Sequence, residues 1–254
     1  MTYRKFHYQL QGAQLDKLSA DDSDLYILDP QKGDGTYWKP GELREVTNNG
    51  KAKALCYLSV GEAEDYRSYW NPFADYVGQE NPDWKGNYRA KFWMPEWQEI
   101  VFKQLDVIMK MGFDGAYLDV VDVYQYWEEQ GRERMAMLML EFIKDIAERA
   151  KKNDSTFLII PQNAPDLLEY RAYVNIIDGI GIENYLYDED DAETSEEHRR
   201  DVDWCLRFLG GKPVFATEYA TVNPDDTVRV LRERGFVPLV TSRELDKNPD
   251  EVTR

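Results

Sequence analysis

Short apolar runs recur along this 254-residue chain, and most of them are followed by a segment whose apolar positions have helical spacing. The runs predict eight β-strands, at residues 6–10, 25–28, 54–60, 116–118, 157–160, 180–182, 214–217 and 236–240. Strands that alternate with helices favour a parallel sheet, because each helical crossover returns the chain to the same edge. Eight such units in about 250 residues predict an α/β fold, a (β/α)8 TIM barrel that occupies residues 1–254 as a single domain.

The helical spacing predicts seven helices, at residues 15–18, 42–46, 97–111, 135–150, 166–170, 196–209 and 225–234. The stretch 62–93 follows neither the helical nor the strand period, and we expect it to be irregular. The alternative fold is an open doubly wound sheet. That fold is disfavoured because no GxGxxG sequence follows the first strand.

Polar residues stand at the ends of six of the eight predicted strands or directly after them: Asp29, Glu62, Asp119, Asn163, Glu183 and Glu218. Each one alone is most simply a helix cap or a loop charge. A barrel would bring all six into one bowl, however, because barrel active sites gather at the C-terminal ends of the strands. Carboxylates that face each other raise one another's pKa, and a carboxyl group kept protonated can serve as the general acid of glycosidic cleavage.

Carboxylates and aromatic rings occur together just after the fourth predicted strand. Asp119 and Asp122 are followed by Tyr124 and Trp127, and flat rings of this kind stack on sugar faces. We expect Asp122 to tune Asp119 or to contact a sugar, and Tyr57 is a further candidate contact from the third strand. The pattern indicates a carbohydrate site. The alternative is that Asp119 caps the next helix while the rings belong to the core.

The net charge of −17 excludes several classes of partner. Nucleic acids and anionic membranes attract clustered Lys and Arg, so neither is expected to bind. The charge suits a neutral or cationic substrate, although acidity also serves solubility. With only two histidines, and with an acidic run at residues 188–191 that lacks the spacing of a calcium loop, no metal and no cofactor are expected.

No apolar run reaches the length of about 18 residues that a membrane helix needs, and the first residues lack the apolar region of an export signal. We therefore expect a cytoplasmic protein, or a secreted or cell-envelope protein if an export signal has been removed. A monomer is favoured, and the oligomeric state stays open.

Five motifs resemble those of one known family. The sequences GFDGAYLDVVD (residues 112–122) and LCYLSVGEAE (55–64) resemble the two most specific motifs of glycoside hydrolase family 114, the endo-α-1,4-polygalactosaminidase family. YQLQG (8–12), PQN (161–163) and GIE (181–183) are similar to three further strand motifs of that family. The resemblance spans nearly the whole chain.

The resemblance implies a barrel that acts on α-linked galactosamine polymers. It also implies a catalytic pair, an Asp on the fourth strand and a Glu on the sixth, at the positions of Asp119 and Glu183. Together with the negative charge, it predicts a cationic polysaccharide or oligosaccharide substrate, such as partly deacetylated α-1,4-galactosamine. Two alternatives stay open: a catalytically inactive carbohydrate-binding barrel, and a structural barrel without a ligand.

The surroundings of the two carboxyl groups suggest their roles. Asp119 is followed by a loop that can donate backbone N–H groups, so we expect it to stay ionised and to act as the nucleophile. Glu183 follows the apolar run 180–182, and packing beside Tyr185 would raise its pKa, which suits a general acid and then base. Such a retaining pair needs carboxyl groups about 5–5.5 Å apart, whereas about 6.5–9.5 Å would make the enzyme inverting.

Overall fold

A computed structural model describes residues 2–188, 192–219, 222–249 and 251. Its central strands are β1 (Phe6–Gln9), β2 (Leu25–Leu28), β3 (Lys53–Ser59), β7 (Gly115–Asp119), β8 (Leu158–Pro161), β9 (Ile180–Glu183), β10 (Val214–Glu218) and β11 (Val237–Val240). All eight predicted strands are present, with bounds that differ by a few residues at most.

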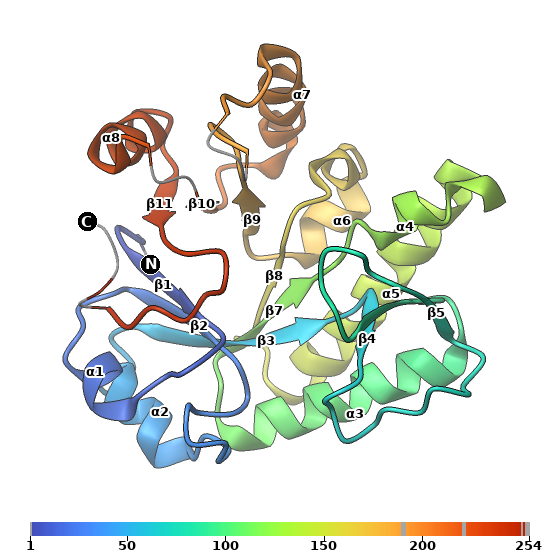
Figure 1. Cartoon of the computed structure of the whole chain (residues 1–254), viewed down its shortest axis with the longest axis horizontal. Helices are drawn as coiled ribbons and strands as arrows, with labels where there is room; N and C mark the ends of the chain where they lie inside the picture. Colours follow the sequence, from blue (N-terminus) through green and yellow to red (C-terminus); the bar gives the residue numbers. More distant parts are fainter. Residues whose placement is uncertain (1, 189–191, 220–221, 250, 252–254) are drawn as a thin grey trace.

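The eight strands form a closed parallel barrel. Five pair in the order β1-β2-β3-β7-β8, and three pair in the order β9-β10-β11. A parallel bridge between Gln162 and Gly181 joins β8 to β9, and β1 lies beside β11. Figure 1 shows the helices on the outside of these strands. The predicted (β/α)8 TIM barrel is therefore confirmed.

The outer layer contains eight α-helices among the described residues: α1 (Leu15–Ser19), α2 (Pro40–Val46), α3 (Pro95–Met111), α4 (Val123–Tyr126), α5 (Arg132–Asn153), α6 (Arg171–Ile176), α7 (Glu196–Leu206) and α8 (Pro224–Glu233). Three 3-10 turns accompany them: η1 (Glu128–Gln130), η2 (Pro165–Glu169) and η3 (Arg207–Leu209). Helix α3 begins at Pro95 and ends at Gly112, whose φ of 92° suits a glycine C-cap. No described helix is long and apolar enough to cross a membrane.

Alternation along the strands separates two cores. Inward-facing side chains such as Tyr8, Leu55, Tyr117 and Phe215 form one apolar cluster inside the barrel. Their neighbours in sequence, such as Ala216, pack instead with the surrounding helices in a second, larger cluster. Because successive side chains of a strand point to opposite faces, this phase also decides which strand-end residues reach the bowl.

The stretch expected to be irregular contains a small antiparallel sheet. Strands β4 (Glu62–Glu64), β5 (Val77–Glu80) and β6 (Asn87–Ala90) pair in the order β4-β6-β5. The expectation was wrong because these strands have only three or four residues and mix polar with apolar side chains, so no two-residue period is visible. The sheet extends the barrel beside the carboxyl end of β3 (Figure 1).

Candidate active site

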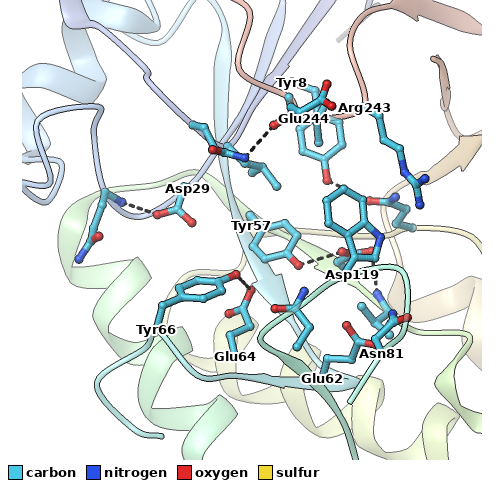
Figure 2. Close-up of a pocket in the computed structure, with 18 of the residues that line it drawn as sticks. Tyr8, Asp29, Tyr57, Glu62, Glu64, Tyr66, Asn81, Asp119, Arg243 and Glu244 are labelled. Carbon is cyan, nitrogen blue, oxygen red and sulfur yellow. Dashed lines mark hydrogen bonds between the residues drawn. The ribbon is translucent and has the colours of Figure 1, made fainter. Parts of the chain in front are cut away.

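A cavity of about 690 Å³ opens at the carboxyl ends of the barrel strands. Six predicted site residues line it: Asp29, Tyr57, Glu62, Asp119, Asp122 and Glu183. Figure 2 shows Tyr57 and Asp119 side by side, with Glu62 and Glu64 below them. Six of the predicted positions, from strand ends far apart in the sequence, thus meet in one cavity.

Asp119 is held at both carboxyl oxygens. Its Oδ2 accepts a hydrogen bond of 2.9 Å from the Tyr57 hydroxyl, and its Oδ1 accepts one of 2.7 Å from the Val120 backbone N–H. Val120 has a φ of 56°, a left-handed conformation that is rare for a β-branched residue and carries strain.

Glu183 is held by two neighbouring strand ends. The Asn163 side chain donates to Glu183 Oε2 over 2.9 Å and accepts from the Glu183 backbone N–H over 3.1 Å. The Tyr219 hydroxyl donates to Oε1. Asn163 does not line the cavity itself but orients a residue that does. Both oxygens of Glu183 are thus hydrogen-bonded, as expected for a group of fixed orientation.

A tight contact supports Glu183 from below. A Cβ atom at Gly181 would overlap the Tyr117 hydroxyl, so only glycine fits at this position of β9. The Tyr117 ring meets the Tyr8 ring edge-to-face with centroids 5.3 Å apart, and the Tyr8 hydroxyl donates to Gln162 over 3.2 Å. These two buried rings form the base beneath the two carboxyl groups.

Burial and mutual repulsion set the protonation of the carboxyl groups. Burial, followed by the charge of Glu183, raises the pKa of Asp119 to about 8. The same two causes raise the pKa of Asp122 to about 6. Burial and the neighbouring charge thus both favour the protonated form of Asp119 in the free protein, because two carboxylates so close cannot both be charged at low cost. This corrects the expectation that Asp119 stays ionised.

Beside Asp29, the cavity is lined by a network of charged side chains that are largely buried. Arg67 forms an ion pair of 2.6 Å with Asp29 and one of 2.9 Å with Glu64. Burial raises the pKa of Glu62, whose Oε1 accepts a hydrogen bond of 2.8 Å from Asn81. Asp29 is therefore neutralised locally, while the Glu62 carboxyl group has no ion-pair contact within the described residues.

Glu218 does not line the cavity, although it ends strand β10. Its side chain is fully buried and accepts backbone N–H groups of Leu186 and Tyr187 over 2.9 and 3.2 Å. Burial raises its pKa to about 7. The physical reason is strand phase: Glu218 points away from the barrel axis, so we do not retain it as a substrate contact.

Three predicted aromatic contacts also lie outside the cavity lining. Tyr185 is fully buried against Phe236, and its hydroxyl donates to Asp203 over 2.8 Å, so it does not shield Glu183. Tyr124 is fully buried and donates to Asp166 over 2.6 Å. Each is held in the outer layer by its own hydrogen bond, and neither is retained as a substrate contact.

Trp127 packs beneath the small antiparallel sheet. Its Nε1 donates to the Ala90 carbonyl over 3.2 Å, and its ring meets Trp93 edge-to-face at 5.3 Å. A Cβ atom at Gly78 would touch the same ring. Trp127 therefore supports the sheet from outside the cavity, and we do not retain it as a sugar platform.

Several lining residues were not predicted from the sequence: Tyr8, Arg67, Trp84, Gln162, Tyr219 and Arg243. Tyr219 could have been found, because it continues the inward phase of Phe215 one residue past the strand. Arg67 and Trp84 carry no such signal, since they lie in the stretch without a visible period.

Metal binding has no geometric support in the part of the chain that the structure describes. No group of three or more His, Cys, Asp or Glu side chains there could hold an ion. Residues 189–191 of the acidic run lie outside the described residues, so the prediction about that run is not tested.

Barrels that place a pair of carboxyl groups in an open bowl are typical of glycoside hydrolases. Comparison with known proteins agrees: the model of glycoside-hydrolase family GH114 matches residues 2–253. The chain therefore belongs to family GH114 and is a glycoside hydrolase.

Two protein relatives of this chain are uncharacterised. One, from Methanocaldococcus jannaschii, is 35% identical over 267 residues and covers 94% of this chain and 76% of its own length. The other, from Deinococcus radiodurans, is 35% identical over 235 residues, with 88% and 74% covered.

Similar solved structures support the fold. The glycoside hydrolase domain of PelA from Pseudomonas aeruginosa superposes with a TM-score of 0.78 at 19% identity, and covers 96% of this chain and 97% of that domain. Aspergillus fumigatus Ega3, solved in complex with galactosamine, gives a TM-score of 0.75 at 19% identity, with 96% and 93% covered. At these identities the likeness shows the fold alone.

Proposed function

We propose that this glycoside hydrolase cleaves α-1,4-linked galactosamine-type polysaccharide, with Asp119 and Glu183 as its catalytic pair. The observation that carries the proposal is that these two carboxyl groups end strands β7 and β9 in one cavity and act on each other electrostatically. Family membership and the galactosamine bound to the similar Ega3 support the choice of sugar.

The charge of the cavity favours a cationic sugar. Glu62 and Asp122 line it without an ion-pair contact among the described residues, and the whole chain carries a charge of −17. An ammonium group that enters would relieve the repulsion that keeps Asp119 protonated, and so would favour the ionised form needed for attack.

The roles follow the retaining scheme. Glu183 donates its proton to the glycosidic oxygen as the bond from that oxygen to C1 breaks. Asp119 attacks C1 and forms a glycosyl ester. Glu183 then takes a proton from water, whose oxygen attacks C1 and releases Asp119 as a carboxylate. The Asp119–Glu183 pair begins the reaction with one proton, which must lie on Glu183 when cleavage begins. That proton leaves with the departing sugar and is replaced by one from the attacking water.

The test is incubation of the protein with partly deacetylated α-1,4-galactosamine oligomers, followed by mass spectrometry and NMR of the first product. Shorter oligomers with retained anomeric configuration are expected, and the rate should fall as salt is added. A 2-deoxy-2-fluoro galactoside with an activated leaving group should label Asp119. An inverted first product, or a label on Glu183, would reject the assigned roles, and binding without cleavage would favour the inactive carbohydrate-binding barrel.

A further inference from the structure

The turn between β5 and β6 brings an unassigned aromatic side chain to the cavity. Trp84 lines the cavity together with its neighbours Asn81 and Lys85, and its side chain is 41% exposed. Large apolar side chains that remain exposed at a binding cavity are candidates for contact with a ligand. Neither the catalytic pair nor its hydrogen-bond partners involve this tryptophan.

The turn that carries Trp84 is held in place before any ligand arrives. The Asn81 side chain donates to Glu62 over 2.8 Å, and the Asn81 backbone N–H donates to the Asn87 carbonyl over 2.7 Å. The Asn87 N–H in turn donates to the Trp84 carbonyl over 3.1 Å. A platform positioned in this way loses little conformational entropy when a ligand binds.

A cation from the opposite loop occupies one side of the ring. The Arg243 guanidinium lies 4.8 Å from the centroid of the Trp84 ring, which is a cation–π geometry. Arg243 also lines the cavity, and Figure 2 places it on the side away from Asp29 and Tyr66. The pair therefore gives this end of the cavity a flat apolar surface with positive charge beside it.

We propose that Trp84 is the platform of a sugar subsite for a galacto-configured ring that carries no charge at C2, such as an N-acetylated unit. The axial C4 hydroxyl of such a ring leaves the C–H groups at C3, C4 and C5 on one face, which can stack on an indole. The charges of Arg243 and Lys85 disfavour an ammonium group there. The inference rests on the proposed function. It adds that the enzyme distinguishes N-acetylated from free-amine units along its substrate.

A purely structural role predicts different behaviour. If the contact between Trp84 and Arg243 only joined two loops, removing the indole would lower the melting temperature and leave KM unchanged. Trp204 offers a matched control, because it is 52% exposed, lies outside the cavity lining and also carries an arginine, Arg207, 5.2 Å from its ring. Loss of this second tryptophan should leave substrate affinity unchanged.

The experiment compares Trp84→Ala, Trp84→Phe, Arg243→Gln and Trp204→Ala with N-acetylated and fully deacetylated α-1,4-galactosamine oligomers of equal length. For the N-acetylated oligomers, Trp84→Ala should raise KM about tenfold and change kcat less than KM, while Trp84→Phe should keep most of the affinity. Arg243→Gln should lower the ratio of the affinity for N-acetylated oligomers to the affinity for free-amine oligomers by about threefold.

Calorimetric titration in the Glu183→Gln background measures the same affinities without turnover. A tenfold loss there on Trp84→Ala, with none on Trp204→Ala, supports the subsite even if the wild-type protein cleaves neither oligomer. Equal affinities for Trp84→Ala and wild type would overturn it while leaving any observed hydrolysis in place. A loss of affinity on Trp84→Ala that is larger for the fully deacetylated oligomer than for the N-acetylated one would overturn the uncharged ring, and absence of binding to either oligomer would reject both proposals.

Discussion

Two glutamates stand at the ends of neighbouring strands and have opposite surroundings. Glu183 ends β9 and Glu218 ends β10, but in the pairing of these strands Glu183 lies beside Thr217, one residue before Glu218. That offset turns Glu183 into the cavity and Glu218 into the outer layer. The residue that does face the cavity from β10 is Tyr219, which bonds to Glu183. Whether a carboxylate at a strand end faces the cavity therefore depends on the side of the strand to which it points, as well as on its place at the end of the strand.

The largest difference between the two glutamates should appear in turnover. Glu183→Gln removes the proposed proton donor, and Asp119→Asn removes the proposed nucleophile, so each should lower kcat by about 10³-fold or more. Hydrolysis of oligomers, with circular dichroism to show an intact fold, measures this. Wild-type turnover in Asp119→Asn would require another cavity carboxylate, such as Asp122 or Glu62, to be the nucleophile.

The next effect is the response of activity to pH. In the proposed mechanism the pair Asp119 and Glu183 must hold one proton when cleavage begins, and the pKa of Asp119 is raised to about 8 by burial and by Glu183. Above that pH the pair loses its proton, so kcat/KM should fall about tenfold per pH unit. A profile that is flat to pH 10 would contradict a shared proton.

A smaller effect is expected from the hydroxyl that orients Glu183. Tyr219→Phe keeps the ring and removes the hydrogen bond to Glu183 Oε1, so kcat should fall about tenfold. A merely structural tyrosine would leave the pH profile unchanged. Loss of this donor should instead move the alkaline limb upward, because the fully ionised form of the Asp119–Glu183 pair is then less stabilised.

The smallest effect on catalysis is expected at Glu218. Glu218→Gln should keep kcat within about threefold and cost about 1–2 kcal/mol of stability at pH 5, since an amide cannot accept both backbone N–H groups. Burial raises the pKa of Glu218 from 4.5 to about 7. Its contribution to stability is therefore full below pH 4.5 and lost as the pH rises through 7. The gap in melting temperature between the variant and wild type should close between pH 5 and 8.

The sequence predicts the features of the fold and the site that depend on residues close together in the chain. The eight strands and the cavity positions of Asp119 and Glu183 rest on local period and strand ends, and both are visible in sequence. Glu218 was placed on the wrong side because the rule about strand ends ignores phase, although the inward run from Phe215 to Tyr219 carries that information.

The other predictions that were wrong concern features that depend on contacts between segments far apart in the chain. Tyr185 and Tyr124 were expected at the site, but each finds a hydrogen-bond acceptor in the helical layer. The raised pKa of Asp119 depends on burial and on Glu183, 64 positions later in the chain. No local pattern encodes distances of that kind.

The left-handed backbone at Val120 lowers the stability of the fold at a position next to the proposed nucleophile. A β-branched residue at a φ of 56° costs about 1–3 kcal/mol, so Val120→Gly or Val120→Asn should raise the melting temperature. A search for heat-tolerant variants would select such changes wherever the strain relieved exceeds the packing that Val120 loses against the core. The same changes would make the Val120 backbone N–H that donates to Asp119 more mobile. Selection for heat tolerance alone would therefore favour variants with higher melting temperatures and lower turnover, unless turnover is selected as well.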